Sequence, residues 1–592
     1  MAALHPGGTM SSKNRFAAFA QAARRTWALT RPYFKSEDRW KARGMLVAIV
    51  LLNLGAVFMN VQINQWNRTF YDALQNKNEA VFWQQVGWFT LLACAYIVIA
   101  VYKFYITQLL ELRWRSWMTS TYLSRWLSHQ AFYRIELARF AKAEGIPDNP
   151  DQRIQEDLQL FTGYTVSLSM GLLNALVSLV SFVGILWTLS GDFTFRFAGS
   201  TWYIAGYMVW AAIAYCIAGS LITHFIGRPL IGLNFRQQRF EADFRHHMIR
   251  VREYSEAIAL DRGQHVEREH LDLRFSRVLA NYLAIIRKQK NLTWFTSFFA
   301  QGANIFPLVV AAPRYFAGAF QIGELMQIGD AFSYVQGSLA WFIDNYSEFA
   351  AWRATTDRLT SFDDSLSAAQ AQGSGEHRTE GDSLSTQALT LALPDGHVLV
   401  SNMNFDAKPG DKVLVKGPSG SGKSTLLRAI GGIWPFARGR VQAPRDAMTI
   451  PQNPYFPDGP LRQALAYPEP ATKYGDDELR AALEQAMLPQ LTSRLDDEDA
   501  WAQKLSGGER QRLALARVFL KQPTWVLADE ATSALDAPAE RTLYERLVQL
   551  VNAKGGALVS IAHRPALEEF HDKRWELVPD GGSNASYRLK TS

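Results

Sequence analysis

Long uncharged apolar runs in the first 350 residues constrain this chain more than any other feature. A helix needs about twenty apolar residues to cross the hydrocarbon core of a bilayer. Runs of that length occupy residues 44–65, 87–109, 165–189, 201–225, 293–315 and 325–347. The last two carry polar residues, which are costly in a membrane unless they face a bundle interior or a wet cavity. The sequence therefore predicts a six-helix membrane domain over residues 44–364.

Basic residues between these runs predict which side of the membrane each connection faces. Cytoplasmic connections carry an excess of Lys and Arg. These residues crowd into segments 1–43, 110–163 and 226–291 and are few in the shorter connections. We therefore expect a cytoplasmic N-terminus, a cytoplasmic C-terminal domain and spans that continue as helices beyond the bilayer. Over residues 16–34, apolar residues at helical spacing among arginines predict a helix lying on the membrane surface.

Composition narrows the remaining possibilities. The net charge of +7 comes from these loops, so we expect no nucleic-acid partner. The two cysteines, Cys94 and Cys216, lie inside apolar runs, where we expect them to act as small buried hydrophobes. Residues 365–386, rich in Gly, Ser, Ala and charge, predict a flexible linker. Residues 387–592 then form a soluble α/β domain.

A glycine-rich segment in this second domain predicts a phosphate-binding loop. It follows an apolar strand at residues 413–415 and precedes a helix expected from Leu426 onward. Its residues are Gly417, Pro418, Ser419, Gly420, Ser421, Gly422, Lys423, Ser424 and Thr425. The glycines let backbone N–H groups wrap phosphates at a helix N-terminus. Lys423 is expected to reach the β- and γ-phosphates of ATP, and the Ser424 hydroxyl to ligate Mg²⁺.

Two later strands end in residues suited to hydrolysis. The apolar run 525–528 ends in Asp529 and Glu530. Asp529 suits Mg²⁺ through water, and Glu530 can polarise the attacking water. His563 follows another apolar run, 557–561, and is positioned to sense the γ-phosphate. An acidic pair is usually surface charge and a lone histidine usually structural, but their places after strands favour catalysis.

Residues 387–580 resemble the nucleotide-binding domain of an ABC transporter. Gln452 matches the Q-loop, residues 505–509 (Leu-Ser-Gly-Gly-Glu) the signature, residues 533–536 the D-loop and His563 the switch histidine. The resemblance assigns Gln452 to the catalytic and Mg²⁺-binding sets. It also implies that Ser506, Gly507 and Gly508 of one copy close on ATP bound by another, with Asp536 in the same interface. It therefore implies an obligate dimer, most simply a homodimer that hydrolyses ATP.

The membrane half resembles a narrower group of transporters. Residues 112–127 and 149–154 are similar to SbmA/BacA-like and peroxisomal fatty-acyl-CoA transporters, and so are residues 455–462 and 467–468 after the Q-loop. A bacterial fusion of this kind resembles uptake proteins for bleomycin, antimicrobial peptides and cobalamin. The resemblance implies an exporter-type six-helix fold in the inner membrane, joined to an α/β P-loop domain. It also implies uptake of peptides or other hydrophilic solutes by alternating access.

Alternatives remain open at this point. A lipid or fatty-acyl-CoA transporter or exporter has the same architecture, whereas six spans disfavour a non-transport ABC ATPase. Asp330, Asp344 and Glu348 are candidates for the solute path, with interhelical polar contacts as the alternative. Residues 149–154 and 253–263 are candidates for coupling to the ATPase, although Asn149-Pro150 is also an ordinary helix start. Finally, Leu393 stands where many family members stack an aromatic ring on adenine.

Overall fold

The computed structural model describes residues 23–140, 149–197, 200–371, 378–581 and 585–592. The chain divides into two compact units. The first comprises Met1–Thr121 and Asp151–Thr360, and the second comprises Tyr122–Pro150 and Ser361–Ser592.

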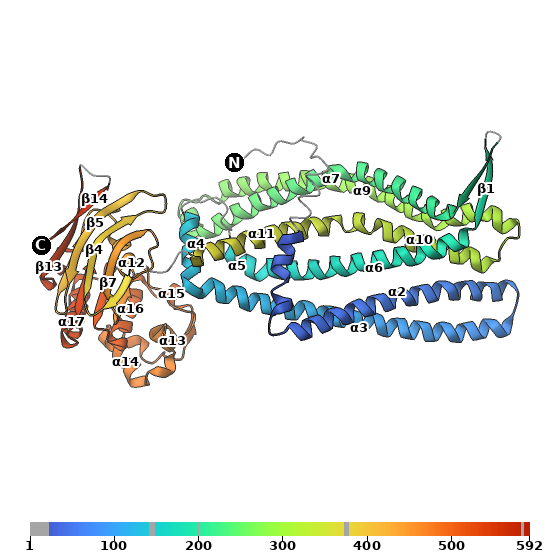
Figure 1. Ribbon diagram of the computed structural model, residues 1–592. Coiled ribbons are helices and arrows are strands. Elements are labelled where there is room, and N and C mark those ends of the chain that lie inside the picture. Colours follow the sequence, from blue (N-terminus) through green and yellow to red (C-terminus); the bar gives the residue numbers. More distant parts are fainter. Residues whose placement is uncertain (1–22, 141–148, 198–199, 372–377, 582–584) are drawn as a thin grey trace. The chain divides into compact units, whose positions relative to one another are not determined.

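Long helices build the first unit (Figure 1). The long helices are α2 (Arg39–Gln75), α3 (Glu79–Leu127), α6 (Leu158–Ser190), α7 (Tyr207–Glu253), α9 (Gln264–Phe316), α10 (Ile322–Asp344) and α11 (Tyr346–Ala371). Two short helices, α5 (Pro150–Gln152) and α8 (Ser255–Leu260), lie between them in the chain, and residues 122–127 of α3 and 361–371 of α11 belong to the second unit. At about 1.5 Å per residue, the 53 residues of α9 extend roughly 80 Å. A bilayer core is about 30 Å thick. The expectation that the spans continue as helices past the bilayer is therefore confirmed.

Five helical segments of the described residues are long and apolar enough to cross a membrane. They are Arg39–Gln75, Glu79–Arg139, Pro150–Ser190, Tyr207–Glu253 and Gln264–Phe316. The sixth expected span is the helix α10, which is not among them because polar residues interrupt its apolar face. It nevertheless packs against α2, α6, α7 and α9. Its buried residues Ile328, Phe332 and Val335 share one apolar cluster with Phe182 of α6, so α10 belongs to the same bundle.

A row of polar contacts, called here the polar seam, joins α10 to α2 and explains why α10 carries polar residues. The contacts pair Asn64 with Gln327, Asn67 with Asp330, Arg68 with Glu324, and Asp72 with the backbone N–H of Gly323. Asp330 therefore makes an interhelical hydrogen bond, which the sequence analysis gave as the alternative to a place on the solute path. Asp344 is exposed and Glu348 is half-buried in the first turn of α11.

The fourth expected span begins later than the apolar run indicates. Strands β1 (Asp192–Phe197) and β2 (Ser200–Ala205) form an antiparallel hairpin, and α7 begins only at Tyr207. Residues 201–204 are Thr-Trp-Tyr-Ile, and such β-branched and aromatic residues favour strands. Gly206 makes the transition at φ +64°, where an added Cβ would lie 2.4 Å from the Trp187 ring.

The linker predicted over residues 365–386 is wrong where the structure describes it. Residues 365–371 complete α11, because Leu366 and Ala369 are buried. Residues 378–386 enter strands β3 (Arg378–Gly381) and β4 (Leu384–Ala392); residues 372–377 lie outside the described ranges. Small polar residues alone do not exclude a helix or strand when apolar residues among them reach a core.

Two smaller expectations are confirmed in part. Cys216 is buried as expected, but Cys94 is exposed, because little of the apolar stretch of α3 is covered by the chain itself. Residues 23–30 are helical, and the rest of the expected surface helix, residues 16–22, lies outside the described residues.

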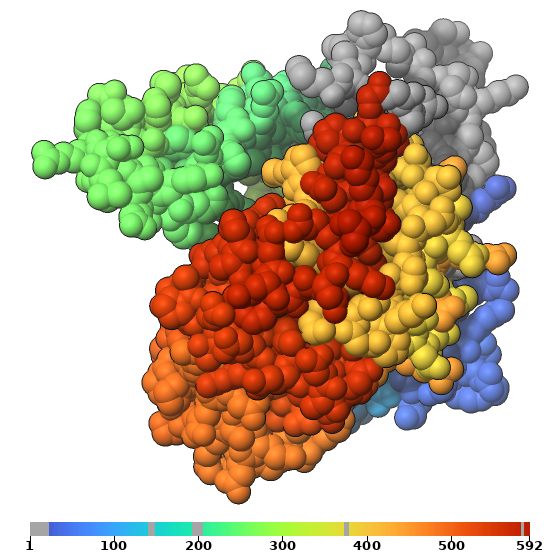
Figure 2. Space-filling view, turned by 90° about the vertical axis from the view of Figure 1, so that its left-hand side faces the viewer, coloured from blue at the N-terminus to red at the C-terminus, as the bar shows by residue number. Residues whose placement is uncertain are grey.

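The second unit contains a ten-stranded sheet in the order β3-β7-β4-β5-β14-β13-β6-β12-β11-β8. Its further strands are β5 (Val398–Ala407), β6 (Lys412–Lys416), β7 (Ala437–Pro444), β8 (Ala447–Ile450), β11 (Trp525–Asp529), β12 (Ala557–Ile561), β13 (Lys573–Pro579) and β14 (Tyr587–Thr591). Strands β9 (Gly459–Pro460) and β10 (Glu498–Asp499) pair separately. In Figure 2 the yellow β4–β5 region lies beside the red C-terminal strands.

Helices cover this sheet and complete two apolar cores. They are α4 (Ala131–Phe140), α12 (Lys423–Ile430), α13 (Leu461–Ala466), α14 (Asp476–Gln485), α15 (Trp501–Lys504), α16 (Gly507–Lys521) and α17 (Ala537–Ala553). Leu137 of α4 packs against the core that holds β6 and α12. Residues 122–150 of the first long connection therefore belong to this unit.

Three parallel neighbours in the sheet set up the site. Strands β6, β12 and β11 are parallel and adjacent, and every residue of β11 and β12 is buried. All three strands expected from the sequence are confirmed. Because parallel strands end at one edge of a sheet, the segments that follow them meet there.

Candidate functional site

The loop after β6 has a backbone that glycine alone fits well. Gly417 lies at φ +151°, and an added Cβ would stand 2.9 Å from the carbonyl oxygen of Leu577. Gly422 lies at φ +94° at the N-cap of α12, and a Cβ added to it would stand 3.2 Å from the Leu399 side chain. The left-handed region disfavours residues with a Cβ. Glycine at these two positions therefore allows the backbone that this loop adopts before α12.

The Lys423 side chain folds back onto this loop. Its Nζ donates to the carbonyl oxygens of Gly417 and Pro418, each at 2.9 Å. Burial lowers the pKa of Lys423, while nearby Glu530 and Asp529 oppose the shift. The hydroxyl of Ser421 is buried without a hydrogen-bond partner in the described residues. A cationic, donor-rich cradle with an unpaired hydroxyl fits the phosphates of ATP.

Two oxygen ligands suited to Mg²⁺ lie together beside the loop. The Ser424 hydroxyl donates to Asp529 Oδ1 at 3.1 Å. Asp529 ends β11 with 9% of its surface exposed, and burial raises its pKa against the opposing effect of the Ser424 hydrogen bond. Mg²⁺ prefers such hard oxygen ligands, so the donor set fits the metal.

The three predicted catalytic side chains meet at the carboxylate of Glu530. Gln452 Nε2 donates to Glu530 Oε2 at 2.9 Å, and His563 Nε2 lies 3.1 Å from Glu530 Oε1. Glu530 itself has φ +48°, and its N–H donates to the carbonyl of Ile561 at 3.1 Å. A non-glycine residue in this conformation costs about 1–2 kcal/mol. Surrounding bonds must therefore hold Glu530 in place.

Gln511, which the sequence analysis missed, supplies several of those bonds. It lies on α16 with 6% of its surface exposed. Its Nε2 donates to the carbonyl oxygen of Glu530 at 3.2 Å and to the Ser533 hydroxyl at 3.0 Å. Its Oε1 accepts from the N–H of Ala534 at 2.8 Å. The only signal in the sequence was an amide among the apolar positions of the helix after the signature.

The signature segment forms the start of α16. The Ser506 hydroxyl accepts from the Glu509 N–H at 3.3 Å and donates to Glu509 Oε2 at 2.8 Å. Hydrogen bonds from Ser506 lower the pKa of Glu509. Gly508 approaches the D-loop closely, since an added Cβ would stand 3.2 Å from the carbonyl of Ala534. This reciprocal cap places a helix N-terminus, with its free N–H groups, at the surface.

The D-loop, residues 533–536, is held by a hydrogen bond from Arg564 and leaves Asp536 exposed. Arg564 donates to the carbonyl of Leu535 at 2.8 Å and to Glu540 at 3.0 Å. Thr532 also donates to Glu540, at 2.8 Å. Asp536 precedes α17 and is exposed. The predicted residues thus form two groups. Residues 417–425, Gln452, Asp529, Glu530 and His563 make one group, and residues 506–508 with Asp536 make the other. Among the described residues no hydrogen bond joins Ser506 to the phosphate loop.

Comparisons with known proteins match both halves of the chain. Residues 29–316 match the family model described as ABC transporter transmembrane region 2, and residues 400–533 match the model described as ABC transporter. The Escherichia coli K12 inner membrane ABC transporter ATP-binding protein YddA is 32% identical, over 93% of this chain and 96% of that protein. This chain belongs to the ABC transporter family. It is a half-transporter that hydrolyses ATP to drive translocation through its helical membrane domain.

Other proteins similar to this ABC transporter come from plants, animals and bacteria. The Arabidopsis thaliana ABC transporter D family member 2, chloroplastic, is 33% identical over 92% of this chain and 84% of that protein. The human lysosomal cobalamin transporter ABCD4 is 27% identical over 91% and 94%. A bacterial Atm1-family ABC exporter with ATP bound has a TM-score of 0.64 at 16% identity, covering 93% of this chain and 95% of that one. This last likeness confirms the exporter-type fold.

The expected adenine position of this ABC transporter is apolar but not aromatic. Leu393 lies between β4 and β5, and its N–H donates to the carbonyl of His397 at 2.8 Å. It is half-buried against the core around β6. Its side chain can offer adenine contact without ring stacking.

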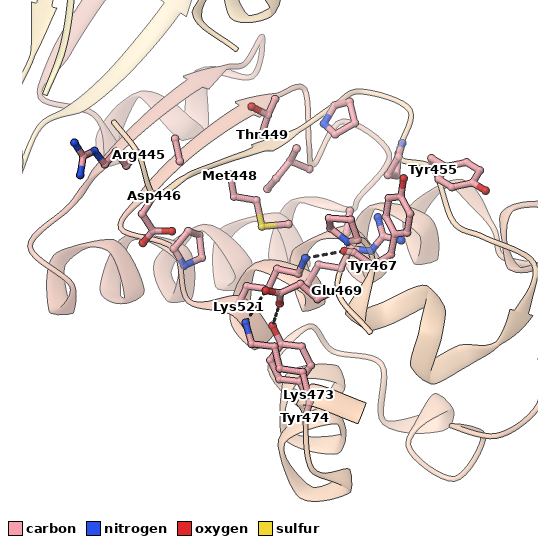
Figure 3. Close-up of a pocket in the computed structure, with 18 residues that line it drawn as sticks. Arg445, Asp446, Met448, Thr449, Tyr455, Tyr467, Glu469, Lys473, Tyr474 and Lys521 are labelled. Atoms are coloured by element: carbon pink, nitrogen blue, oxygen red, sulfur yellow. Dashed lines mark hydrogen bonds and ion pairs between the residues drawn. The ribbon is translucent and has the colours of Figure 1, made fainter. Parts of the chain in front are cut away.

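A separate cavity of about 610 Å³ lies beside the Q-loop (Figure 3). Strand β8, the segment after Gln452 and α16 line it. The Arg517 guanidinium lies 4.4 Å from the Phe456 ring centroid and donates to the carbonyl of Ala464 at 2.6 and 2.9 Å. Burial lowers the pKa of Arg517 to about 10. Lys521 donates to the Tyr467 carbonyl at 2.8 Å, so this wall is firmly held.

Proposed function

We propose that this ABC half-transporter works as a homodimer in the inner membrane of a bacterium. Each ATP would lie between the phosphate loop of one copy and the Ser506–Gly508 segment of its partner. The observation that supports this proposal is that Ser506 is bonded to Glu509 and that no hydrogen bond among the described residues joins it to the phosphate loop. Each group presents donors suited to phosphate, and only a second copy supplies both to one nucleotide.

The contacts at the first group support specific roles. Lys423 neutralises the β- and γ-phosphates, while Ser424, Asp529 and Gln452 serve the Mg²⁺ site. Glu530 orients and deprotonates the attacking water, because its carboxylate is directed by Gln452 and His563 from both sides. Closure of the two copies drives alternating access in the membrane helices, and hydrolysis releases it.

Glu530→Gln tests the assigned base. General-base catalysis contributes about 10²–10⁴-fold, so ATPase turnover should fall by at least about 100-fold while ATP still binds. Glu484→Gln, the same change at an exposed residue, should leave turnover unaltered. Retention of wild-type turnover by Glu530→Gln would show that another group activates the water.

A mixed-dimer experiment tests the shared sites. Copies carrying Lys423→Ala and copies carrying Ser506→Ala, both with Glu530→Gln, are purified as homodimers and as tagged mixed dimers. If sites form between copies, the mixed dimer has one intact site and traps one ATP, whereas both homodimers trap none. Absence of trapped ATP in the mixed dimer contradicts the arrangement.

For the solute, we propose uptake of peptides or other hydrophilic molecules such as cobalamin. The relative named as a lysosomal cobalamin transporter supports this class, and the resemblance to peroxisomal fatty-acyl-CoA transporters keeps an acyl lipid or fatty-acyl-CoA solute as the second candidate. Uptake of labelled peptide, cobalamin and acyl-CoA is measured in proteoliposomes, with Glu530→Gln as the inactive control. Movement of acyl-CoA alone would replace the first candidate by the second.

A further inference from the structure

An apolar cavity lies in the first unit, outside everything assigned to ATP or solute. Its volume is about 490 Å³, within the range of ligand sites. Buried residues Ile49 of α2, Trp114 of α3 and Val166 of α6 contribute to its lining. Trp27 and Phe34 of the N-terminal segment line it as well. The cavity thus joins the N-terminal segment to three helices of the membrane domain.

Two polar atoms buried beside this cavity lack partners. The hydroxyl of Thr30 and the indole N–H of Trp114 have no hydrogen-bond partner in the described residues. Both residues line the cavity, with 9% and 1% of their surfaces exposed. An indole N–H can only donate, and a buried donor left unpaired is costly. Neither group therefore has an acceptor oxygen beside it among the described residues.

Cations line the same cavity. Arg31, Lys35 and Arg43 contribute to the lining and are exposed, and no acidic residue lines it among the described residues. Arg43 is oriented by donating to the carbonyl of Phe34 at 2.9 and 3.1 Å. An occupant must therefore combine an apolar body with acceptor oxygens and negative charge.

The surroundings indicate where such an occupant comes from. Trp27 and Trp40 are 63% and 72% exposed, and exposed tryptophans beside basic residues are typical of a membrane interface. The cytoplasmic leaflet supplies anionic lipids that attract such basic segments. Arg25 also pairs with Asp357 of α11 at 2.8 Å, so the helix over residues 23–30 is fixed against the bundle.

We propose that this cavity binds one anionic glycerophospholipid of the cytoplasmic leaflet. An acyl chain fills the apolar space between α2, α3 and α6. The Trp114 N–H and the Thr30 hydroxyl donate to ester or phosphate oxygens, and Arg31, Lys35 and Arg43 neutralise the phosphate. The bound lipid then joins the N-terminal segment to the bundle.

Native mass spectrometry of the delipidated full chain tests this site. Dioleoyl phosphatidylglycerol, which is anionic, and dioleoyl phosphatidylcholine, which is zwitterionic, are titrated separately, so that the acyl chains are the same and only the headgroup differs. Each basic residue at a membrane surface contributes about fivefold to binding. Arg31→Ala with Lys35→Ala should therefore weaken the phosphatidylglycerol adduct about thirtyfold. The matched double variant Arg39→Ala with Lys41→Ala removes two exposed cations of the same segment that do not line the cavity and should change binding less than threefold.

Further measurements distinguish a bound phospholipid from other occupants of the cavity. Trp114→Phe keeps an aromatic side chain but removes the indole N–H donor, and should weaken the adduct about tenfold in a chain whose thermal unfolding is unchanged. Glycerol phosphate, a headgroup without acyl chains, should not bind. Equal binding of the two lipids, or equal losses in the two double variants, overturns the proposal. So does a gain in lipid binding seen only after removal of residues 1–22, because that result makes the segment itself the occupant.

Discussion

Gln511→Leu is the most informative single change at the ATPase site. Leucine has a similar size but removes the three hydrogen bonds to Glu530, Ser533 and Ala534. Each such bond contributes about 0.5–1.5 kcal/mol net, which amounts to about 3 kcal/mol. That exceeds the cost of about 1–2 kcal/mol for the left-handed conformation of Glu530. Glu530 is therefore free to relax away from Gln452 and His563.

The expected result is a loss of turnover without a loss of nucleotide binding. If about 1.4 kcal/mol of the lost hydrogen-bond energy is added to the activation barrier of ATP hydrolysis, the rate falls tenfold. We expect kcat for ATP to fall at least about tenfold in proteoliposomes. The Kd for a fluorescent ATP analogue should stay within about twofold, because Gln511 bonds to no residue of the phosphate loop.

Gln490→Leu provides the matched control. Gln490 also bonds to α16, but only through one 3.4 Å contact with Glu509 on the exposed surface. The same chemical change there should leave kcat within about twofold. Wild-type turnover and unchanged thermal unfolding in Gln511→Leu would refute the reasoning, since Glu530 would then keep its position without these bonds.

Three further changes have outcomes fixed by the structure. Burial raises the pKa of Asp529, so the folded protein disfavours the charged carboxylate. The free energy of unfolding therefore falls as the pH rises from the ordinary aspartate range through that raised pKa. Asp529→Asn should therefore raise the nucleotide-free melting temperature at neutral pH while abolishing Mg²⁺-dependent hydrolysis; a lower melting temperature contradicts this. Asp157→Asn removes a carboxylate that is 2% exposed and paired with Arg153 and Arg358, so it should destabilise the chain by about 3 kcal/mol in thermal unfolding, unlike Asp151→Asn at an exposed neighbour. Leu393→Tyr should tighten ATP binding about fivefold, because base–aromatic stacking contributes about 1–3 kcal/mol; an unchanged Kd places adenine elsewhere.

Local patterns predicted the ATPase half well because its chemistry is local. The phosphate loop, the strand ending in Asp529 and the strand before His563 each combine an apolar run with a fixed terminal residue. Gln511 escaped prediction because its bonds depend on how α16 approaches the D-loop, which no local pattern expresses. The same reason explains Asp330, whose partner Asn67 lies 263 positions earlier in the chain.

The membrane half was predicted less well because hydropathy does not distinguish a lipid-facing residue from one in a strand or a seam. Residues 201–204 are apolar enough to span, yet they form the β1–β2 hairpin. Conversely, α10 carries polar residues because α2 offers partners for them. Composition also misassigned residues 365–371, where two buried apolar side chains were enough to continue α11.

In the proposed dimer, the cap at Ser506 makes closure between copies depend on ATP. The hydroxyl has one proton, which it donates to Glu509 at 2.8 Å. Contact with a partner's γ-phosphate requires that proton to turn away from Glu509. Without nucleotide the exchange loses a charge-assisted bond and gains nothing, so the open arrangement is favoured. With ATP a phosphate oxygen replaces the carboxylate. The hydroxyl lone pair can still accept from the Glu509 N–H, so α16 keeps its cap while its N-terminus faces the phosphate.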